Sequence, residues 1–177
     1  MTAKAKNYSI WLVPQKKDGE YLTDVIKNLA KKFDSPVFGP HISVYDATIE
    51  KEQLIKILKD CTLGMRPFNL QVDKLNYTDH IFKTVFAEIE EDEILNNLYE
   101  RLKNALKNFG EYEMKPHISL IYKKMPSQEK VEIIKSLNIK TEFTFGSLAA
   151  VFPDNETMDW YDVPSWKTDI KVSFGEN

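Results

Sequence analysis

Apolar and polar positions follow two alternating periods along this chain, which predicts strands and helices in turn. Residues 8–14, YSIWLVP, alternate like a strand that stops at its proline, and residues 20–33 place apolar side chains at helical spacing. A turn leads into a strand that begins PHISVYDA, and residues 49–61 carry a second helical stripe. Residues 68–77 alternate like a half-buried strand. The first half therefore reads strand, helix, strand, helix, strand.

The same order begins again at Phe82. The expected elements are a strand over 82–90, a helix over 92–109, the strand PHISLIY, a helix over 127–137 capped by Ser127, and closing strands near 142–152 and 166–174. The segment order predicts an α+β fold with antiparallel sheets in two lobes. We interpret residues 1–177 as one bilobal domain built by internal duplication, with repeat one about 8–61, repeat two about 82–137 and closing strands about 142–174.

A shared tetrapeptide marks the two copies. PHISV at 40–44 returns as PHISL at 116–120, and these motifs hold two of the three histidines in the chain. Trp11 precedes His41 by 30 residues, and Val85 precedes His117 by 32. The similar spacing makes duplication a better explanation than chance.

Strand geometry predicts which side chains of each motif face the cleft and which face the core. Side chains alternate between the faces of a strand, so His41 and Ser43 project from one face, about 7 Å apart, and the aliphatic neighbours point to the core. His117 and Ser119 repeat this arrangement. If the lobes face each other about a pseudo-twofold axis, the cleft between them holds two imidazoles and two hydroxyls. Such a site suits a tetrahedral phosphate.

Composition narrows the class of function. The chain has 177 residues, 42% of them apolar, with 24 basic and 27 acidic residues, so a long nucleic-acid backbone held by counterion release is a poor fit. A small phosphorylated ligand remains open. No stretch is long enough for a membrane span or a secretory segment, and Cys61 alone cannot form an internal disulfide. We expect a cytoplasmic monomer.

The paired motifs supply both proton roles in phosphodiester hydrolysis. A base must take a proton from water and an acid must protonate the leaving oxygen, and two histidines can provide one of each. Ser43 and Ser119 would donate hydrogen bonds to the non-bridging oxygens, so the reaction does not require a metal ion or other cofactor. A cyclic phosphodiester suits this apparatus because ring strain lowers the barrier.

These motifs resemble those of a known superfamily. The paired His-x-Ser strands are similar to the two His-x-Ser/Thr-x motifs of the two-histidine (2H) phosphoesterases. YSIWLVP, FGPHISV, FKTVFAEIE and KPHISLIY resemble, in the same order, segments of the plant and fungal cyclic phosphodiesterases, and the resemblance runs from about residue 8 to 174. It implies a bilobal fold of two antiparallel sheets flanked by helices around a central cleft. It also implies metal-independent hydrolysis of ADP-ribose 1″,2″-cyclic phosphate or nucleoside 2′,3′-cyclic phosphates to the 1″- or 2′-phosphate.

The resemblance also assigns residues. His41, Ser43, His117 and Ser119 fall on the catalytic motif, and Tyr122 matches a tyrosine of the substrate pocket. Family assignments make the second histidine the base and the first the acid. The chain lacks the cysteine pairs that form disulfides in the plant enzymes.

Other polar and aromatic residues are candidates for binding substrate. We expect Tyr122, Phe82 and Lys83 in the substrate pocket. Further candidates are Trp11 and Trp166 for stacking on a base, and Lys115, Lys123 and Lys124 for a second phosphate. His80 reads as a structural residue. A zinc site assembled from the three histidines with Asp46 or Asp79 is formally possible, although no pair of ligands shares one element at the usual spacing.

Two other functions stay open. The same machinery could act on RNA ends, 2′–5′ linkages or cyclic dinucleotides. Alternatively, the cleft could bind AMP-like nucleotides without turnover, although two complete proton-transfer motifs argue against a sensor.

Overall fold

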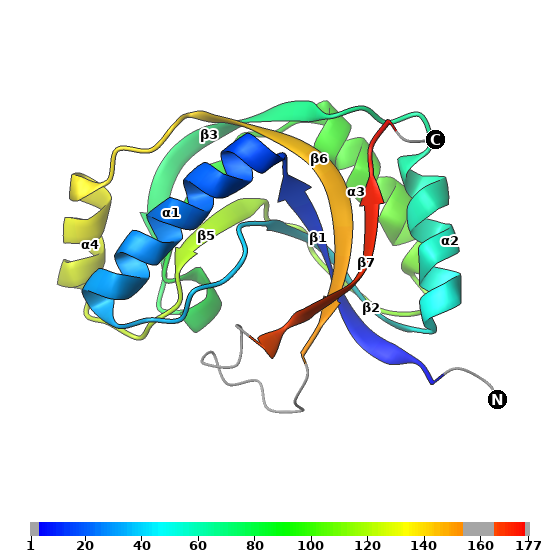
Figure 1. Ribbon diagram of the computed structural model, residues 1–177, viewed down its shortest axis with the longest axis horizontal. Coiled ribbons are helices and arrows are strands. Elements are labelled where there is room, and N and C mark those ends of the chain that lie inside the picture. Colours follow the sequence, from blue (N-terminus) through cyan, green and yellow to red (C-terminus); the bar gives the residue numbers. More distant parts are fainter. Residues whose placement is uncertain (1–3, 154–164, 176–177) are drawn as a thin grey trace.

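The order of strands and helices follows the hydrophobic pattern throughout residues 4–153 and 165–175, the part of the chain that the computed structural model describes. The α+β prediction with antiparallel strands is confirmed (Figure 1). The elements are β1 (Lys6–Pro14), α1 (Lys16–Phe33), β2 (Ile42–Ile49), α2 (Lys51–Thr62), β3 (Phe68–Tyr77), the 3₁₀ turn η1 (Ile81–Lys83), β4 (Val85–Ile89), α3 (Glu93–Leu106), β5 (His117–Ile121), α4 (Ser127–Ser136), β6 (Glu142–Phe152) and β7 (Lys167–Ser173).

Three element boundaries differ from the prediction. Helix α1 begins four residues earlier than expected, at Lys16, because its first turn is polar and adds nothing to the apolar stripe. The strand expected from Phe82 begins at Val85, after the turn η1. Pro126 occupies the N-cap position of α4 and Ser127 is the first helical residue, so the predicted Ser127 cap is wrong. Proline suits this boundary because it lacks the N–H that a helix start leaves unpaired.

The sheet runs in the order β2-β1-β6-β3-β4-β5, with β7 paired to β6. All pairings are antiparallel. Strand β3 joins the two lobes, since residues 68–71 pair with β6 and residues 72–77 pair mainly with β4. The six-strand order is unchanged when β1, β2 and β3 are exchanged with β4, β5 and β6. This symmetry supports the predicted duplication, and it shows that each lobe takes its third strand from the other half.

Strand register defines which residues correspond between the halves. Trp11 pairs with Ser43 directly after a shift in register, and Phe86 pairs with Ser119 directly after an equivalent shift. The counterpart of Trp11 is therefore Phe86, one residue beyond the Val85 that sequence spacing selects. Each β-bulge places an aromatic ring beside the histidine of its own half.

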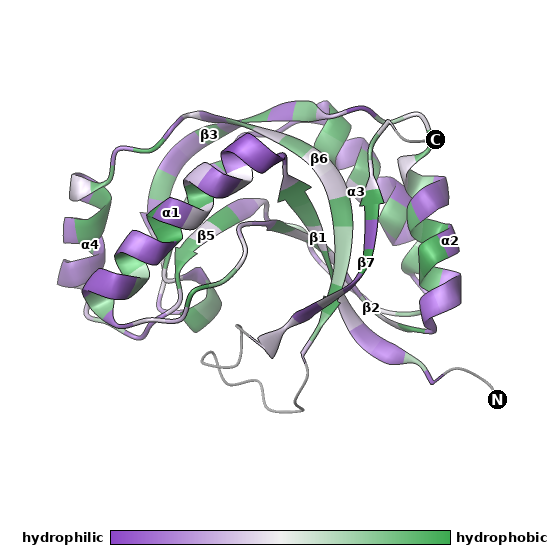
Figure 2. Cartoon of the chain, viewed as in Figure 1, coloured by the Kyte–Doolittle hydropathy of each residue, from purple (hydrophilic) through white to green (hydrophobic). Residues whose placement is uncertain are grey.

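The helices cover the sheet from two flanks, with α1 and α4 on one side of Figure 1 and α2 and α3 on the other. Helix α1 packs against β5 and α3 packs against β2, so each half contributes a helix to the other half's sheet. In Figure 2 the helices carry alternating hydrophilic and hydrophobic bands, as amphipathic surface helices do.

The aliphatic residues of both PHIS motifs lie in the core. Ile42, Val44, Ile118 and Leu120 are fully buried, as strand alternation requires if the histidines and serines face the opposite side. Within the described ranges, no helix combines the length and the apolar character that crossing a membrane requires.

Candidate active site

A cavity of about 420 Å³ lies between the two lobes, and both PHIS strands open into it. Seven residues predicted from sequence to act in catalysis or in the substrate pocket line this cavity: His41, Ser43, Phe82, Lys83, His117, Ser119 and Tyr122. The other lining residues are Ser9, Trp11, Asp46, His80, Tyr112, Glu113, Lys115 and Trp166. Segments far apart in the sequence therefore meet at one concave site, which is the usual form of a small-molecule site.

Each catalytic candidate histidine is oriented by the backbone two residues before it. The Nδ1 atom of His41 lies 2.7 Å from the Gly39 carbonyl oxygen, and the Nδ1 atom of His117 lies 2.7 Å from the Lys115 carbonyl oxygen. A carbonyl can only accept, so in both rings Nδ1 carries the hydrogen and Nε2 is left for the cavity. The two halves thus present the same nitrogen in the same tautomer.

His41 is the more enclosed of the two histidines. Its residue surface is 8% exposed, and the face of Trp11 stacks on its ring with centroids 3.5 Å apart and planes 4° apart. Burial lowers the pKa of His41 to about 4; the hydrogen bond to Gly39 opposes this shift and the nearby His117 adds to it. The ring is neutral at pH 7 in the unliganded site.

His117 has an edge contact in place of a stack. The Phe86 ring meets it at 71° with centroids 5.3 Å apart. Burial lowers the pKa of His117, its backbone hydrogen bond and Glu88 oppose this shift, and the positive charges of Lys83 and His80 add to it. His117 is therefore also mostly neutral at pH 7, but charged neighbours set its proton affinity more than they do for His41.

The two serines each pair with a tyrosine. Ser119 Oγ donates to the Phe82 carbonyl at 2.8 Å and interacts with the Tyr122 hydroxyl. Ser43 makes a hydrogen bond with Tyr112, whose pKa burial raises to about 12. Burial also raises the pKa of Tyr122, so both tyrosines keep their protons at pH 7. The sequence predicted that both serines donate into the cleft, whereas the Ser119 proton here points to a backbone carbonyl and must turn to reach a ligand.

One wall of the cavity is basic. His80 and Lys83, from the segment between β3 and β4, face Lys115 near the start of β5. Lys83 Nζ lies 4.3 Å from the centre of the Phe86 ring, and burial, together with the positive charge of Lys115, lowers its pKa. This wall favours an anionic ligand.

The wall beside His41 combines aromatic rings with an acid. Trp11 stacks against Trp166 with centroids 5.8 Å apart, and its Nε1 atom donates to Ser9 Oγ at 3.0 Å. Asp46 lies opposite Ser9 in the β1–β2 pairing. Enclosure by the protein raises the pKa of Asp46, and a hydrogen bond from Ser9 opposes the shift. Flat rings beside a hydrogen-bonding rim suit a nucleobase or ribose.

Sequence reasoning missed part of this lining. Ser9 lies two residues before Trp11 on the same strand face, so alternation could have revealed it. Tyr112 and Glu113 lie in the irregular segment before β5, where no period places side chains. His80, interpreted as structural, is instead exposed and lines the cavity.

Two lysines proposed for a second phosphate do not line the cavity. Lys123 Nζ donates to the carbonyl oxygens of Phe33 and Asp34, at the end of α1. It therefore caps that helix, as cations near helix C-termini do. Lys124 is exposed and absent from the cavity wall. The basic wall is formed by Lys83 and Lys115, together with His80.

The zinc alternative gains no support from side-chain positions. Among the residues that the structure describes, no three His, Cys, Asp or Glu side chains are grouped so that they could hold a metal ion. Metal sites need several such ligands at fixed distances.

Comparison with known proteins places this site in a family. Residues 7–167 match the family described as cyclic phosphodiesterase-like protein. A cyclic phosphodiesterase of Arabidopsis thaliana is 23% identical over 124 residues, covering 70% of this chain and 68% of that protein. The crystal structure of TT0787 of Thermus thermophilus superposes with a TM-score of 0.64 at 14% identity, covering 97% of this chain and all of that one.

A second structural relative has been crystallised with a nucleotide. Escherichia coli LigT complexed with 3′-AMP superposes with a TM-score of 0.58 at 12% identity, covering 97% of this chain and 99% of LigT. At this identity the likeness concerns the fold. The family match extends over most of the sequence, including both PHIS motifs. The chain therefore belongs to the cyclic phosphodiesterase-like proteins, a family of 2H phosphoesterases, and is a phosphodiesterase.

Proposed function

We propose that this protein hydrolyses small cyclic phosphodiesters, namely ADP-ribose 1″,2″-cyclic phosphate, nucleoside 2′,3′-cyclic phosphates or both, to the 1″- or 2′-phosphate. The observation that carries the proposal is the mirrored pair of histidines. Each donates its Nδ1 hydrogen to the backbone, so each has Nε2 available to one shared cavity. A base and an acid on opposite sides of phosphorus are what in-line hydrolysis requires.

The proton transfers balance with one proton on the pair. His117 Nε2 takes a proton from the attacking water as its oxygen bonds to phosphorus. The bond from phosphorus to one ribose oxygen breaks, and protonated His41 gives its Nε2 hydrogen to that oxygen. His117 ends protonated and His41 neutral, and exchange with solvent restores the starting state. The family resemblance supports these roles.

Substrate binding favours uptake of the starting proton from solvent. Both histidines have lowered pKa values in the unliganded site, mainly through burial. A phosphate anion placed between them favours the imidazolium form, so proton uptake accompanies binding. Because an enclosed imidazolium is a strong acid, His41 is suited to protonate the leaving oxygen.

The serines and the basic wall complete the proposed mechanism. Ser43 and Ser119 donate to the non-bridging phosphate oxygens, and Lys83 offsets the negative charge. Trp11, Phe82 and Tyr122 offer aromatic surface to the base. The complex of LigT with 3′-AMP supports a nucleotide as the ligand of this fold.

A second candidate is activity on longer nucleotides, such as RNA ends with a cyclic phosphate. A hollow of about 850 Å³ adjoins the cavity and shares Ser9, Asp46 and Trp166 with it. That space could hold a nucleotide next to the reacting one.

The deciding experiment measures hydrolysis of ADP-ribose 1″,2″-cyclic phosphate, the four nucleoside 2′,3′-cyclic phosphates and a short RNA ending in a cyclic phosphate. EDTA is present throughout, and the accumulating ester is identified. We expect the 1″- or 2′-phosphate, with small substrates turned over faster than RNA. Preference for RNA would favour the second candidate, and no product from any substrate would contradict both.

A further inference from the structure

The segment between β3 and β4, residues 78–84, forms part of the active-site wall. It places three side chains along the cavity, those of His80, Phe82 and Lys83. Its backbone also reaches the motif, because the Phe82 carbonyl accepts the Ser119 hydroxyl at 2.8 Å. The position of this loop therefore affects both the charge of the cavity and the direction of a serine.

Thr78 holds the loop closed from within. Its Oγ1 atom donates to the Lys83 carbonyl at 2.5 Å and accepts from the His80 backbone N–H at 3.1 Å. Its own N–H donates to the Thr84 carbonyl at 3.3 Å. These three bonds link both ends of the loop to one residue, so whatever fixes Thr78 fixes the loop.

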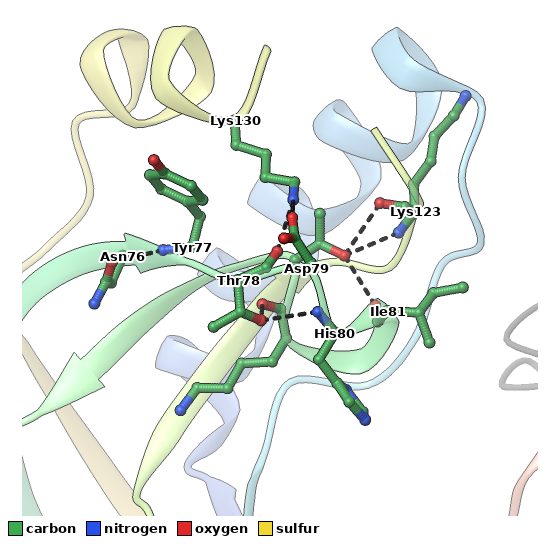
Figure 3. Close-up of polar contacts among 10 residues, drawn as sticks. Asn76, Tyr77, Thr78, Asp79, His80, Ile81, Lys123 and Lys130 are labelled. Carbon is green, nitrogen blue, oxygen red and sulfur yellow. Dashed lines mark hydrogen bonds and ion pairs between the residues drawn. The ribbon is translucent and has the colours of Figure 1, made fainter. Parts of the chain in front are cut away.

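Lys130 fixes Thr78 from outside. It extends from α4, and its Nζ atom donates to the Thr78 carbonyl at 2.8 Å and to Asp79 Oδ1 at 2.6 Å (Figure 3). The Tyr77 ring lies 5.7 Å from the same nitrogen. The Lys130 side chain is 3% exposed, whereas that of Asp79 is 94% exposed. The ammonium is thus inside the protein, and its carboxylate partner projects into solvent.

The other half of the molecule shows that packing does not require a lysine here. Lys130 lies 13 residues after His117, and Leu54 lies 13 residues after His41. Both are the fourth residue of their helices, and Leu54 is fully buried. A leucine satisfies the core, while burying an ammonium opposes stability. The lysine therefore calls for another explanation.

We propose that Lys130 is a positioning residue for the hydrolysis, which holds the 78–84 loop against the cavity through Thr78. In that place the loop directs His80 and Lys83 toward the substrate and keeps the Phe82 carbonyl beside Ser119. The inference rests on the proposed function, and it adds a residue of α4 that lines no part of the cavity.

The test compares Lys130→Leu with Lys135→Leu, an exposed lysine of the same helix. The first variant leaves no buried charge unpaired, because Asp79 is in solvent, so we expect Tm to stay within about 4 °C of wild type. Its kcat/KM on cyclic phosphates should fall by about 10²-fold, because the 78–84 loop no longer holds its side chains in place beside the substrate. Lys135→Leu should match wild type in both.

The His117 pKa, measured by NMR titration, separates positioning from mere stability. His117 is surrounded by Lys83 and His80 from the loop, Glu88 from β4 and His41, the residue before β2. If the loop moves away, Lys83 and His80, which both lower the His117 pKa, leave its surroundings, so that pKa should rise in Lys130→Leu. This measurement needs no turnover, so it tests the inference even if wild type is inactive on every substrate and the proposed function fails.

Thr78→Val provides an independent variant. It removes the hydroxyl that ties His80 to Lys83 but leaves the carbonyl that Lys130 holds. Its kcat/KM should fall and its His117 pKa should rise, and the double variant should be little worse than the stronger single one. If Lys130→Leu fails to fold, Thr78→Val alone decides the question. Wild-type kcat/KM and an unchanged His117 pKa in a folded variant would overturn the proposal.

Discussion

The half of the site that contains His41 and the half that contains His117 share a backbone and differ in their surroundings. In both, a proline precedes the histidine, Nδ1 binds the carbonyl two residues earlier, and a bulge sets an aromatic ring beside the imidazole. Trp11 covers the face of His41, whereas Phe86 meets His117 with its edge. Charged groups gather near His117. The two halves thus share a geometry, and unequal neighbours give the two histidines different proton affinities.

This difference matters for the proposed mechanism, in which the two halves of the site take different roles. Equal histidines would compete for one proton, while unequal ones would divide the work of acid and base. The enclosed His41 holds a proton weakly and so gives it up readily. The pKa of His117 is lowered partly by Lys83 and His80, from the segment between β3 and β4. A substitution in one half can therefore be compared with the matching substitution in the other.

The largest effect should come from removing either histidine. His41→Ala and His117→Ala should each lower kcat by about 10²- to 10⁴-fold, because each removes one proton transfer. Steady-state kinetics on a cyclic phosphate measures this, with circular dichroism as the folding control. The kcat of the double variant should be little lower than that of the less active single variant. Wild-type turnover in either single variant would refute the two-histidine mechanism.

The serines should come next. Ser43→Ala and Ser119→Ala should each lower kcat by about 10²- to 10³-fold if their hydroxyls stabilise charge on phosphate. Ser119 is also bound to the Phe82 carbonyl, and Ser43 to Tyr112, so each variant should also lose some stability. Thermal unfolding measured beside kinetics separates the loss of stability from the loss of turnover. Equal Tm and unchanged kcat in both would exclude this role.

Substitution of the two aromatic counterparts should affect different properties, mainly stability for Phe86 and mainly activity for Trp11. Phe86 is 1% exposed, so Phe86→Ala should lower the free energy of unfolding by about 3–5 kcal/mol. Trp11 is half-buried, and Trp11→Ala should cost about tenfold in kcat/KM, the value of one aromatic contact, with a smaller loss of stability. The pKa of His41 should rise because solvent reaches the ring. Denaturant unfolding and steady-state kinetics are measured on both variants. Equal losses of unfolding free energy and of kcat/KM in the two variants would contradict the expected difference.

The smallest effect concerns pH. In the free enzyme both histidines have lowered pKa values, and the mechanism needs one proton on the pair. The value of kcat/KM should therefore fall as pH rises through the pKa of His117, which lies below the ordinary histidine value of about 6.5. Lys83→Gln removes a positive charge beside His117, so this limb should move to higher pH by less than about one unit. A shift to lower pH would show that the sign of the coupling is wrong.

Sequence reasoning reached the elements and the centre of the site because both depend on short periods. Alternation located β1 and β2, and the repeated PHIS placed two histidines on equivalent strand faces. The start of α1 was missed, since a polar first turn has no apolar stripe. The pairing of Trp11 with Phe86 depends on bulges, which shift a register without leaving a mark in the spacing.

The lining from irregular segments could not be predicted for a different reason. Tyr112 and His80 reach the cavity from stretches without a period, where only the tertiary fold decides direction. The bond from Ser119 to the Phe82 carbonyl joins residues 37 apart, and the anchor at Lys130 spans 52 residues. The type of a side chain indicates that it will form a hydrogen bond or ion pair, but the sequence does not show with which distant residue.

If two unequal histidines bind one phosphate, as proposed, an NMR pH titration will detect both the inequality and the shared ligand. The ring C–H signals of His41 and His117 are assigned with the single variants and followed from about pH 3 to 9, a range that spans the ordinary histidine pKa, first in free protein and then with saturating 2′-AMP. In the free protein we expect a His41 pKa near 4 and a higher value for His117, still below the ordinary 6.5. Binding of the nucleotide monoester should raise both pKa values. Equal pKa values in the free protein, or a shift of one histidine alone on binding, would contradict it.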